Sequence, residues 1–217
     1  MARPVLYVLA GVNGAGKSSI GGFLLTREGL SWFNPDTFAR DLMGATGCDL
    51  ESANVHAWAE SVRRLDEAVA QGQSYAFETT LGGHMVAAKI QAATRTHDVI
   101  IWFCGLDSPE RHLDRVRARV SQGGHDIPEA KIRARYPRAQ RTLIALMPHV
   151  AHLRVYDNSV EAATGDPVSD PVLLMELAQG RLVQPSANDR TALERTPEWA
   201  KALVEAALSL DEVASRR

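Results

Sequence analysis

Short, continuous apolar runs alternate along the chain with longer segments in which apolar residues recur every three or four positions. Runs of this length and content are typical of parallel strands that are buried on both faces. The predicted strands are residues 5–10, 74–78, 98–105 and 151–157. Because helical segments alternate with these strands, the pattern predicts an α/β fold: a mostly parallel sheet between two helical layers, with ligands at the carboxyl ends of the strands.

The longest predicted helix covers residues 50–71, and its apolar residues form one stripe along the helix. The stripe consists of Val55, Trp58, Val62, Leu65 and Val69. Stripes with this spacing usually pack in a protein core, so we predict that this one is buried. A face that binds a partner is the alternative.

The end of the chain has a different character. Residues 159–217 predict a loop, a hairpin and a closing helix that has Thr196 as its N-cap. We expect this tail to pack on a core formed by residues 1–158, so that residues 1–217 make one domain.

Composition narrows the class of protein without identifying it. The chain has 217 residues, of which 45% are hydrophobic and 23% charged, as in ordinary globular proteins. A net charge of -2 gives no general attraction to nucleic acids or to anionic membranes. The two cysteines, Cys48 and Cys104, make no disulfide framework, and no apolar run has the length of a membrane span. We therefore expect a cytoplasmic protein.

Residues 11–18, GVNGAGKS, directly follow the first predicted strand and match the G-x-x-x-x-G-K-[ST] phosphate-loop pattern. Glycines let the backbone turn so that N–H groups converge on phosphate oxygens, and the helix predicted over residues 16–28 adds its positive end. Lys17 is expected to reach the β- and γ-phosphates of ATP, and the Ser18 hydroxyl to ligate Mg²⁺. The residues expected to hold the nucleotide are Gly11, Asn13, Gly14, Ala15, Gly16, Lys17, Ser18 and Ser19.

A carboxylate follows the extended segment SWFN at residues 31–34, within FNPDTFAR. Asp36 is expected at the carboxyl edge of the sheet, where it could accept the proton of an attacking hydroxyl group. The alternative is that Asp36 caps the helix that follows, since aspartate is a preferred N-cap.

The predicted strand at 74–78 ends in FETT, which places Glu78 at the same edge. A carboxylate there could hold Mg²⁺ through water or hydrogen-bond an acceptor molecule. Thr79 and Thr80 add two hydroxyl groups to the site, with helix capping as their alternative role.

A basic segment at residues 111–141 contains nine of the 24 Lys and Arg residues of the chain. Arg115 and Arg119 lie one turn apart on one helical face, and a second basic helix carries Arg135. Two glycines lie between the two helices, so the region at about 115–135 predicts a lid that closes over the transferred phosphate. With Tyr136 as its sole aromatic residue, the segment is a poor match to a nucleic-acid surface.

Taken together, GVNGAGKSS, NPD, FETT, RVRARV and GGHDIPEAKIRARY resemble the zeta-toxin-like kinases over residues 4–158. The resemblance implies a nucleoside-kinase-like fold and ATP-dependent phosphorylation of the 3′-hydroxyl of the amino sugar in UDP-N-acetylglucosamine. It implies Asp36 as the base, with Glu78 and Thr80 on the acceptor. Of the lid arginines expected on the phosphates, Arg119 is the first choice, followed by Arg115 and Arg135.

We therefore predict a kinase that transfers the γ-phosphate of ATP to a hydroxyl group of a small molecule, most specifically a UDP-sugar. A base at the sheet edge favours a hydroxyl acceptor, and a closing lid favours exclusion of water. Three alternatives remain open: a kinase of the same fold with another acceptor, an ATP-dependent switch or nucleic-acid-binding NTPase, and a toxin held inactive by an antitoxin protein.

Overall fold

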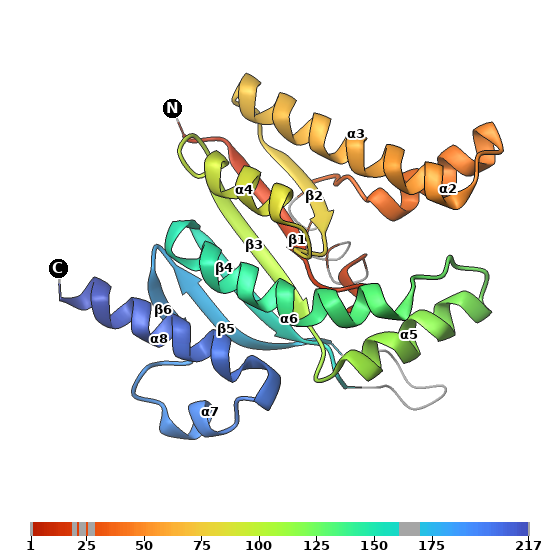
Figure 1. Ribbon diagram of the computed structural model, residues 1–217. Helices are drawn as coiled ribbons and strands as arrows, with labels where there is room; N and C mark the ends of the chain where they lie inside the picture. The colour runs from red at the N-terminus through yellow and green to blue at the C-terminus, as the bar shows by residue number, and fades with distance from the viewer. Residues whose placement is uncertain (1, 19–20, 22–24, 26–28, 161–169, 217) are drawn as a thin grey trace.

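The computed structural model describes residues 2–18, 21, 25, 29–160 and 170–216, and its central feature is a six-stranded sheet (Figure 1). The strands are β1 (Val5–Ala10), β2 (Tyr75–Thr79), β3 (Asp98–Gly105), β4 (His152–Asp157), β5 (Val172–Ala178) and β6 (Arg181–Gln184). Their order in the sheet is β2-β1-β3-β4-β5-β6. The first four are parallel, and β5 and β6 are antiparallel. The predicted α/β fold, its mostly parallel sheet and the C-terminal hairpin are confirmed.

The strand register aligns the ends of the central strands. Ala10, the last residue of β1, lies opposite Thr79 at the end of β2 and opposite Phe103 near the end of β3. The phosphate loop therefore leaves the sheet beside the ends of β2 and β3. One edge of the sheet thus receives the residues that the sequence marks as functional.

Most of the helices agree with the predicted segments, but the one at Arg190–Glu194 has no counterpart among the predictions. The helices are α2 (Pro35–Thr46), α3 (Leu50–Gln71), α4 (His84–Ala93), α5 (Pro109–Ser121), α6 (Glu129–Leu146), α7 (Arg190–Glu194) and α8 (Lys201–Ser215), with short 3₁₀ turns at Met147–His149 and Glu198–Ala200. Of the helix predicted at 16–28, Lys17, Ser18, Gly21 and Leu25 are helical, and the rest lies outside the described residues. Among the described helices, none combines the length and apolarity needed to cross a bilayer.

Apolar side chains pack against both faces of the sheet. On one face, strand residues such as Ile101 pack with Leu143 of α6 and Leu203 of α8, and the three helices α4, α6 and α8 lie across this face (Figure 1). On the other face, Leu9 and Trp102 pack with Leu25. Burial on both faces explains why β1 and β3 are nearly continuous apolar runs in the sequence.

The prediction that the stripe of α3 is core is wrong for its first half. Val55 and Trp58 are exposed by 61% and 48%, whereas Leu65, two turns further on, is buried. The buried face in this half of α3 instead carries small residues, among them Ala53 and Ala57, which pack closely against α2. Because these small residues occupy the face of α3 that packs against α2, Val55 and Trp58 lie on an exposed face of the helix.

The start of the last helix also differs from the prediction. Pro197 has extended backbone angles and precedes the 3₁₀ turn, after which α8 begins at Lys201. The Thr196 hydroxyl donates a hydrogen bond backward to the Ala192 carbonyl. Thr196 is therefore not the N-cap of this helix.

Candidate active site

The phosphate loop turns sharply between β1 and the helical residues Lys17 and Ser18, and glycine is required at its bends. Gly11, Gly14 and Gly16 have positive φ angles of 143°, 82° and 84°. A Cβ atom at Gly11 would lie 2.3 Å from the Cys104 carbonyl oxygen, and one at Gly16 would lie 2.4 Å from Asn158 Nδ2. Side chains at these positions would clash, so the glycines allow the loop to pack against the ends of neighbouring strands.

Three side chains from outside the motif hold the loop. The buried His112 ring donates from Nδ1 to the Asn13 carbonyl at 2.8 Å, because a carbonyl can only accept. Asn158 donates to the Ala15 carbonyl at 2.9 Å, and Arg135 donates to Asn13 Oδ1 at 2.7 Å. Helices α5 and α6 and the end of β4 thus hold the loop in its shape.

Burial of His112 has a consequence for stability that can be measured. Burial, the largest effect, lowers the pKa of His112 to about 4. The unfolded chain, with a histidine pKa of about 6.5, binds the proton first, so stability is lost as pH falls from about 6.5 to 4. The loss attributable to this group is at most about 3–4 kcal/mol.

We expect the non-titrating variant His112→Gln to lose less stability between pH 7 and pH 4.5 than the unmodified protein, as measured by urea unfolding. The control is His56→Gln, which changes an exposed histidine of α3. The same pH dependence in His112→Gln as in the unmodified protein would show that His112 does not cause the loss.

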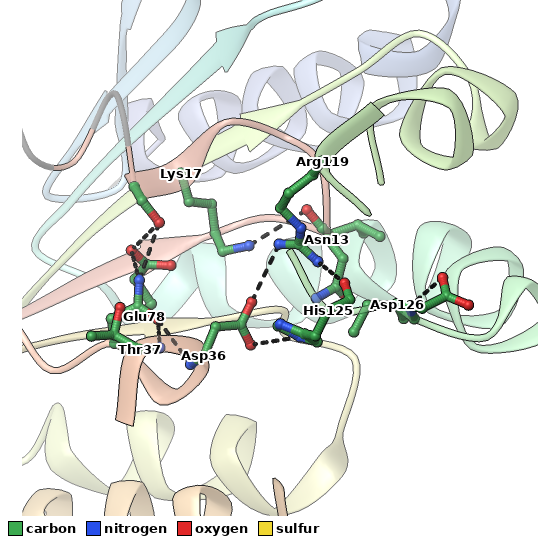
Figure 2. A network of polar contacts seen from close by, with 12 residues as sticks. Asn13, Lys17, Asp36, Thr37, Glu78, Arg119, His125 and Asp126 are labelled. Atoms are coloured by element: carbon green, nitrogen blue, oxygen red, sulfur yellow. Dashed lines mark hydrogen bonds and ion pairs between the residues drawn. The ribbon is translucent and has the colours of Figure 1, made fainter. Parts of the chain in front are cut away.

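A polar cluster joins the phosphate loop to the end of β2 (Figure 2). Glu78 is 6% exposed, and its Oε1 accepts hydrogen bonds from the Ser18 hydroxyl at 2.9 Å, Trp32 Nε1 at 3.0 Å and Asn34 Nδ2 at 3.0 Å. The Phe33 backbone makes two hydrogen bonds to β2. Its carbonyl accepts from the Glu78 N–H group, and its own N–H group donates to the Ala76 carbonyl. This pairing brings Asn34 beside Glu78.

The cluster also has the chemistry of a magnesium site. Mg²⁺ prefers oxygen ligands and usually keeps several waters while it bridges one or two protein groups and substrate phosphates. The Ser18 hydroxyl and the Glu78 carboxylate offer such oxygens 2.9 Å apart, directly after the phosphate loop. The residues present therefore fit Mg²⁺.

Asp36 lies in the first turn of α2, and Figure 2 shows its carboxylate between Arg119 and His125. Arg119 Nη1 is 3.6 Å from one carboxylate oxygen, and His125 Nε2 is 3.8 Å from the other. The N-cap of α2 is Asn34, whose Oδ1 accepts from the Asp36 and Thr37 N–H groups. The alternative role of Asp36 as the N-cap is therefore wrong, because the Asn34 side chain caps α2.

The predicted lid arginines occupy different places. Arg119, near the end of α5, lies beside Asp36 and donates to the His125 carbonyl at 3.1 Å. Arg135 contacts the phosphate loop, and burial lowers its pKa. Arg115 donates to the carbonyl of Asn158, the residue that donates to Ala15 of the loop, at 2.6 Å. Arg117, by contrast, is 66% exposed and pairs with Asp114 and Glu129.

A cavity of about 950 Å³ opens over this region. Lys17, Asp36 and Glu78 line it together, and so do Thr79 and Thr80. The two threonine hydroxyls accept from the N–H groups of Leu81 and Gly82, and the N-cap of α4 is Gly83. The threonines shape the loop before α4, so their predicted alternative role as helix caps is wrong.

The structure thus brings together the predicted residues of the phosphate loop, Asp36, Glu78, Thr79, Thr80, Arg119 and Arg135, while Ser19 lies outside the described residues. Sequence reasoning missed the polar partners Asn34, Trp32, His125 and Asn158. Asn34 could have been found, because asparagine directly before a proline is a strong signal for an N-cap followed by the first helical residue. Nothing local in the sequence marks the other three.

Known proteins are similar to this chain at low sequence identity. No protein-family model matches the chain. An uncharacterized protein of Haemophilus influenzae is 26% identical over 144 residues, which are 63% of this chain and 100% of that protein. A presumed kinase from Chloroflexus aurantiacus J-10-fl has a TM-score of 0.52 and 19% identity, covering 64% of this chain and 80% of its own.

Two further solved structures are similar over a larger share of this chain. AvrRxo1-ORF1:-ORF2 with ATP has a TM-score of 0.63 and 15% identity, covering 97% of this chain and 76% of its own. A structure from the PezAT chromosomal toxin-antitoxin system of Streptococcus pneumoniae has a TM-score of 0.52 and 14% identity, covering 72% and 68%. At these identities the likeness establishes the fold alone: the chain shares its α/β fold with these structures.

Proposed function

We propose that this protein is an ATP-dependent kinase that phosphorylates a hydroxyl group of a small molecule. The observation that carries the proposal is that Lys17 of the phosphate loop and the Asp36 carboxylate line the same cavity. Lys17 supplies charge for the transferred phosphoryl group, and Asp36 supplies a base for the attacking hydroxyl. A solved structure of similar fold that holds ATP supports the choice of nucleotide.

The proposed residues divide the reaction among them. Asp36 takes the proton of the acceptor hydroxyl as that oxygen bonds to the γ-phosphorus, while the bond from the γ-phosphorus to the β–γ bridging oxygen breaks and ADP leaves. Lys17 and Arg119 hold the charge of the phosphoryl oxygens during transfer. Ser18 and Glu78 would hold Mg²⁺, which when bound neutralises charge on the β- and γ-phosphates.

We further propose a nucleotide sugar as the acceptor, UDP-N-acetylglucosamine first, phosphorylated at the 3′-hydroxyl of the sugar. A diphosphate-linked acceptor carries negative charge, and Lys131 and Arg135 line the cavity in addition to Lys17. Thr79 and Thr80 offer hydroxyl groups to the sugar in the same cavity. The resemblance to zeta-toxin-like kinases supports this choice of acceptor.

The test is an incubation of purified protein with ATP, Mg²⁺ and UDP-N-acetylglucosamine, followed by mass spectrometry of the products. One added phosphate on the sugar nucleotide is the expected result. If only another hydroxyl compound from a metabolite extract is phosphorylated, the kinase proposal stands and this acceptor is wrong. If water is the only acceptor, or if DNA or RNA stimulates ATP consumption, the kinase proposal is wrong.

A toxin role is a related proposal, because one structure of similar fold belongs to a toxin-antitoxin system. We expect that producing the protein in a bacterial host arrests growth and that the Lys17→Ala variant does not. Co-purification of a small partner protein that abolishes kinase activity would identify the antitoxin. Normal growth with fully active protein would exclude the toxin role and leave the kinase proposal intact.

We expect the Arg119→Ala variant to lower kcat for transfer by roughly 10–1000-fold with a smaller change in KM for ATP, because its guanidinium meets the phosphoryl group mainly in the transition state. The matched control is Arg117→Ala, two residues away on the same helix and paired with Asp114 on the surface. Steady-state kinetics of both variants measure the effect. Equal losses in the two would indicate a diffuse basic surface rather than a phosphoryl contact.

A further inference from the structure

An unburied tryptophan lines the candidate active site. Trp58 is 48% exposed and Val55, on the preceding turn of α3, is 61% exposed, yet both face the cavity that contains Lys17 and Asp36. A large aromatic side chain left half exposed in a concave site has no packing role that explains it. Asn54, on the same helix, adds an amide with both donors and an acceptor to this wall.

The α3 residues Asn54, Val55 and Trp58 line the same cavity as Asp36, the proposed base for the acceptor hydroxyl. The phosphate-loop residues that line the cavity are Asn13 and Lys17, and Asp36 lines it with them. Gly16 and Ser18 of the loop are not among the described lining residues, and neither are Arg115 and Asn158, which contact each other beside Ala15 of the loop. Trp58 is therefore placed to meet the acceptor rather than the adenine of ATP.

The lining from α6 and the segment before it includes charged and apolar side chains, among them Asp126. Lys131 and Arg135 line the cavity from α6, and Ile127 lines it from the segment before that helix. A cavity of about 950 Å³ is large enough for a ligand of nucleotide size. An aromatic wall together with separate basic groups suits a ligand that has a planar ring at one end and phosphate next to it.

We propose that Trp58, with Val55 and Asn54, forms a subsite that binds the nucleobase of the acceptor by stacking. The inference rests on the proposed function, because it takes the cavity as the acceptor site, and it adds that the acceptor is recognised through a base. Every nucleobase has a π-face, and stacking on an aromatic side chain favours binding without hydrogen-bond readout. Asn54 supplies the polar contacts that can distinguish one base edge from another.

The experiment measures binding in the absence of ATP, so that it does not depend on catalysis. Isothermal titration calorimetry with UMP as the probe, and with ribose 5-phosphate as the base-free probe, compares the unmodified protein with Trp58→Leu and Trp58→Phe. We expect UMP to bind more tightly than ribose 5-phosphate, and Trp58→Leu to weaken UMP binding by roughly 10–100-fold. Trp58→Phe, which keeps an aromatic face, should restore most of the affinity, and Met85→Ala, at an exposed apolar residue of α4 that is not among the lining residues, should change nothing.

Equal binding of ribose 5-phosphate and UMP would overturn the subsite, and so would UMP binding that is unchanged in Trp58→Leu. If that variant keeps its UMP affinity and also changes the association state of the protein in size-exclusion chromatography, these α3 residues form a protein contact instead. If the expected binding is found while no acceptor is phosphorylated, the subsite stands and the kinase proposal fails on its own.

Discussion

Replacing Lys17 by alanine should abolish phosphoryl transfer and sharply weaken ATP binding. Lys17 carries the only formal positive charge within the loop at 11–18, and its Nζ lies 3.5 Å from the Val12 carbonyl, folded along the loop. The amide groups of the loop would remain, but the charge that meets the β- and γ-phosphates would be lost. We expect a fall in kcat/KM of about 10³ or more, measured with labelled ATP, and a weaker ATP affinity measured by calorimetry.

The control for this variant is Lys89→Ala. Lys89 pairs with Asp66 at 2.6 Å on the surface between α3 and α4, and it is not among the residues that line the cavity. It removes the same charge from the protein and should leave turnover unchanged. Full activity in Lys17→Ala would remove the nucleotide interpretation altogether.

Replacing Asp36 by asparagine should lower transfer by roughly 10²–10⁴ while ATP affinity stays within a few-fold, because the amide cannot accept the proton of the acceptor hydroxyl. The structure makes this variant informative, since Asn34 rather than Asp36 caps α2. Loss of the exposed contact with Arg119 should cost less than about 1 kcal/mol of stability. Steady-state kinetics, ATP titration and urea unfolding separate the three effects.

The matched control is Asp41→Asn, which changes an exposed carboxylate on the same helix. It should alter neither kcat nor stability by a measurable amount. Turnover in Asp36→Asn equal to that of the control would exclude Asp36 as the base. A loss of ATP affinity as large as the loss of turnover would mean that Asp36 acts on the nucleotide instead.

The sheet and the phosphate loop could be predicted because both depend on local pattern. Buried parallel strands are continuous apolar runs, and β3 was predicted with its observed bounds at 98–105. A loop motif between a strand and a helix is equally local. The shared location of Glu78 and Asp36 could be predicted because the carboxyl ends of parallel strands lie at one edge of the sheet. Both residues line the cavity.

The contacts that complete the site could not be predicted, because they join residues far apart in the sequence. Arg119 reaches Asp36 across 83 positions, and Asn158 reaches Ala15 across 143. The prediction that the apolar stripe of α3 is buried was wrong for a related reason. Its periodicity could not show that Ala53 and Ala57 would pack against α2 and leave Trp58 turned toward the cavity.

The supports beneath the phosphate loop limit how far the motif can be transplanted. Gly11 packs against the Cys104 carbonyl, Asn13 is held by His112 and Arg135, and Asn158 fills the space above Gly16. A host protein that received GVNGAGKS alone would lack the imidazole, guanidinium and amide that hold it. Grafting the loop into another α/β scaffold would therefore require a graft of its neighbours from α5, α6 and the end of β4 as well.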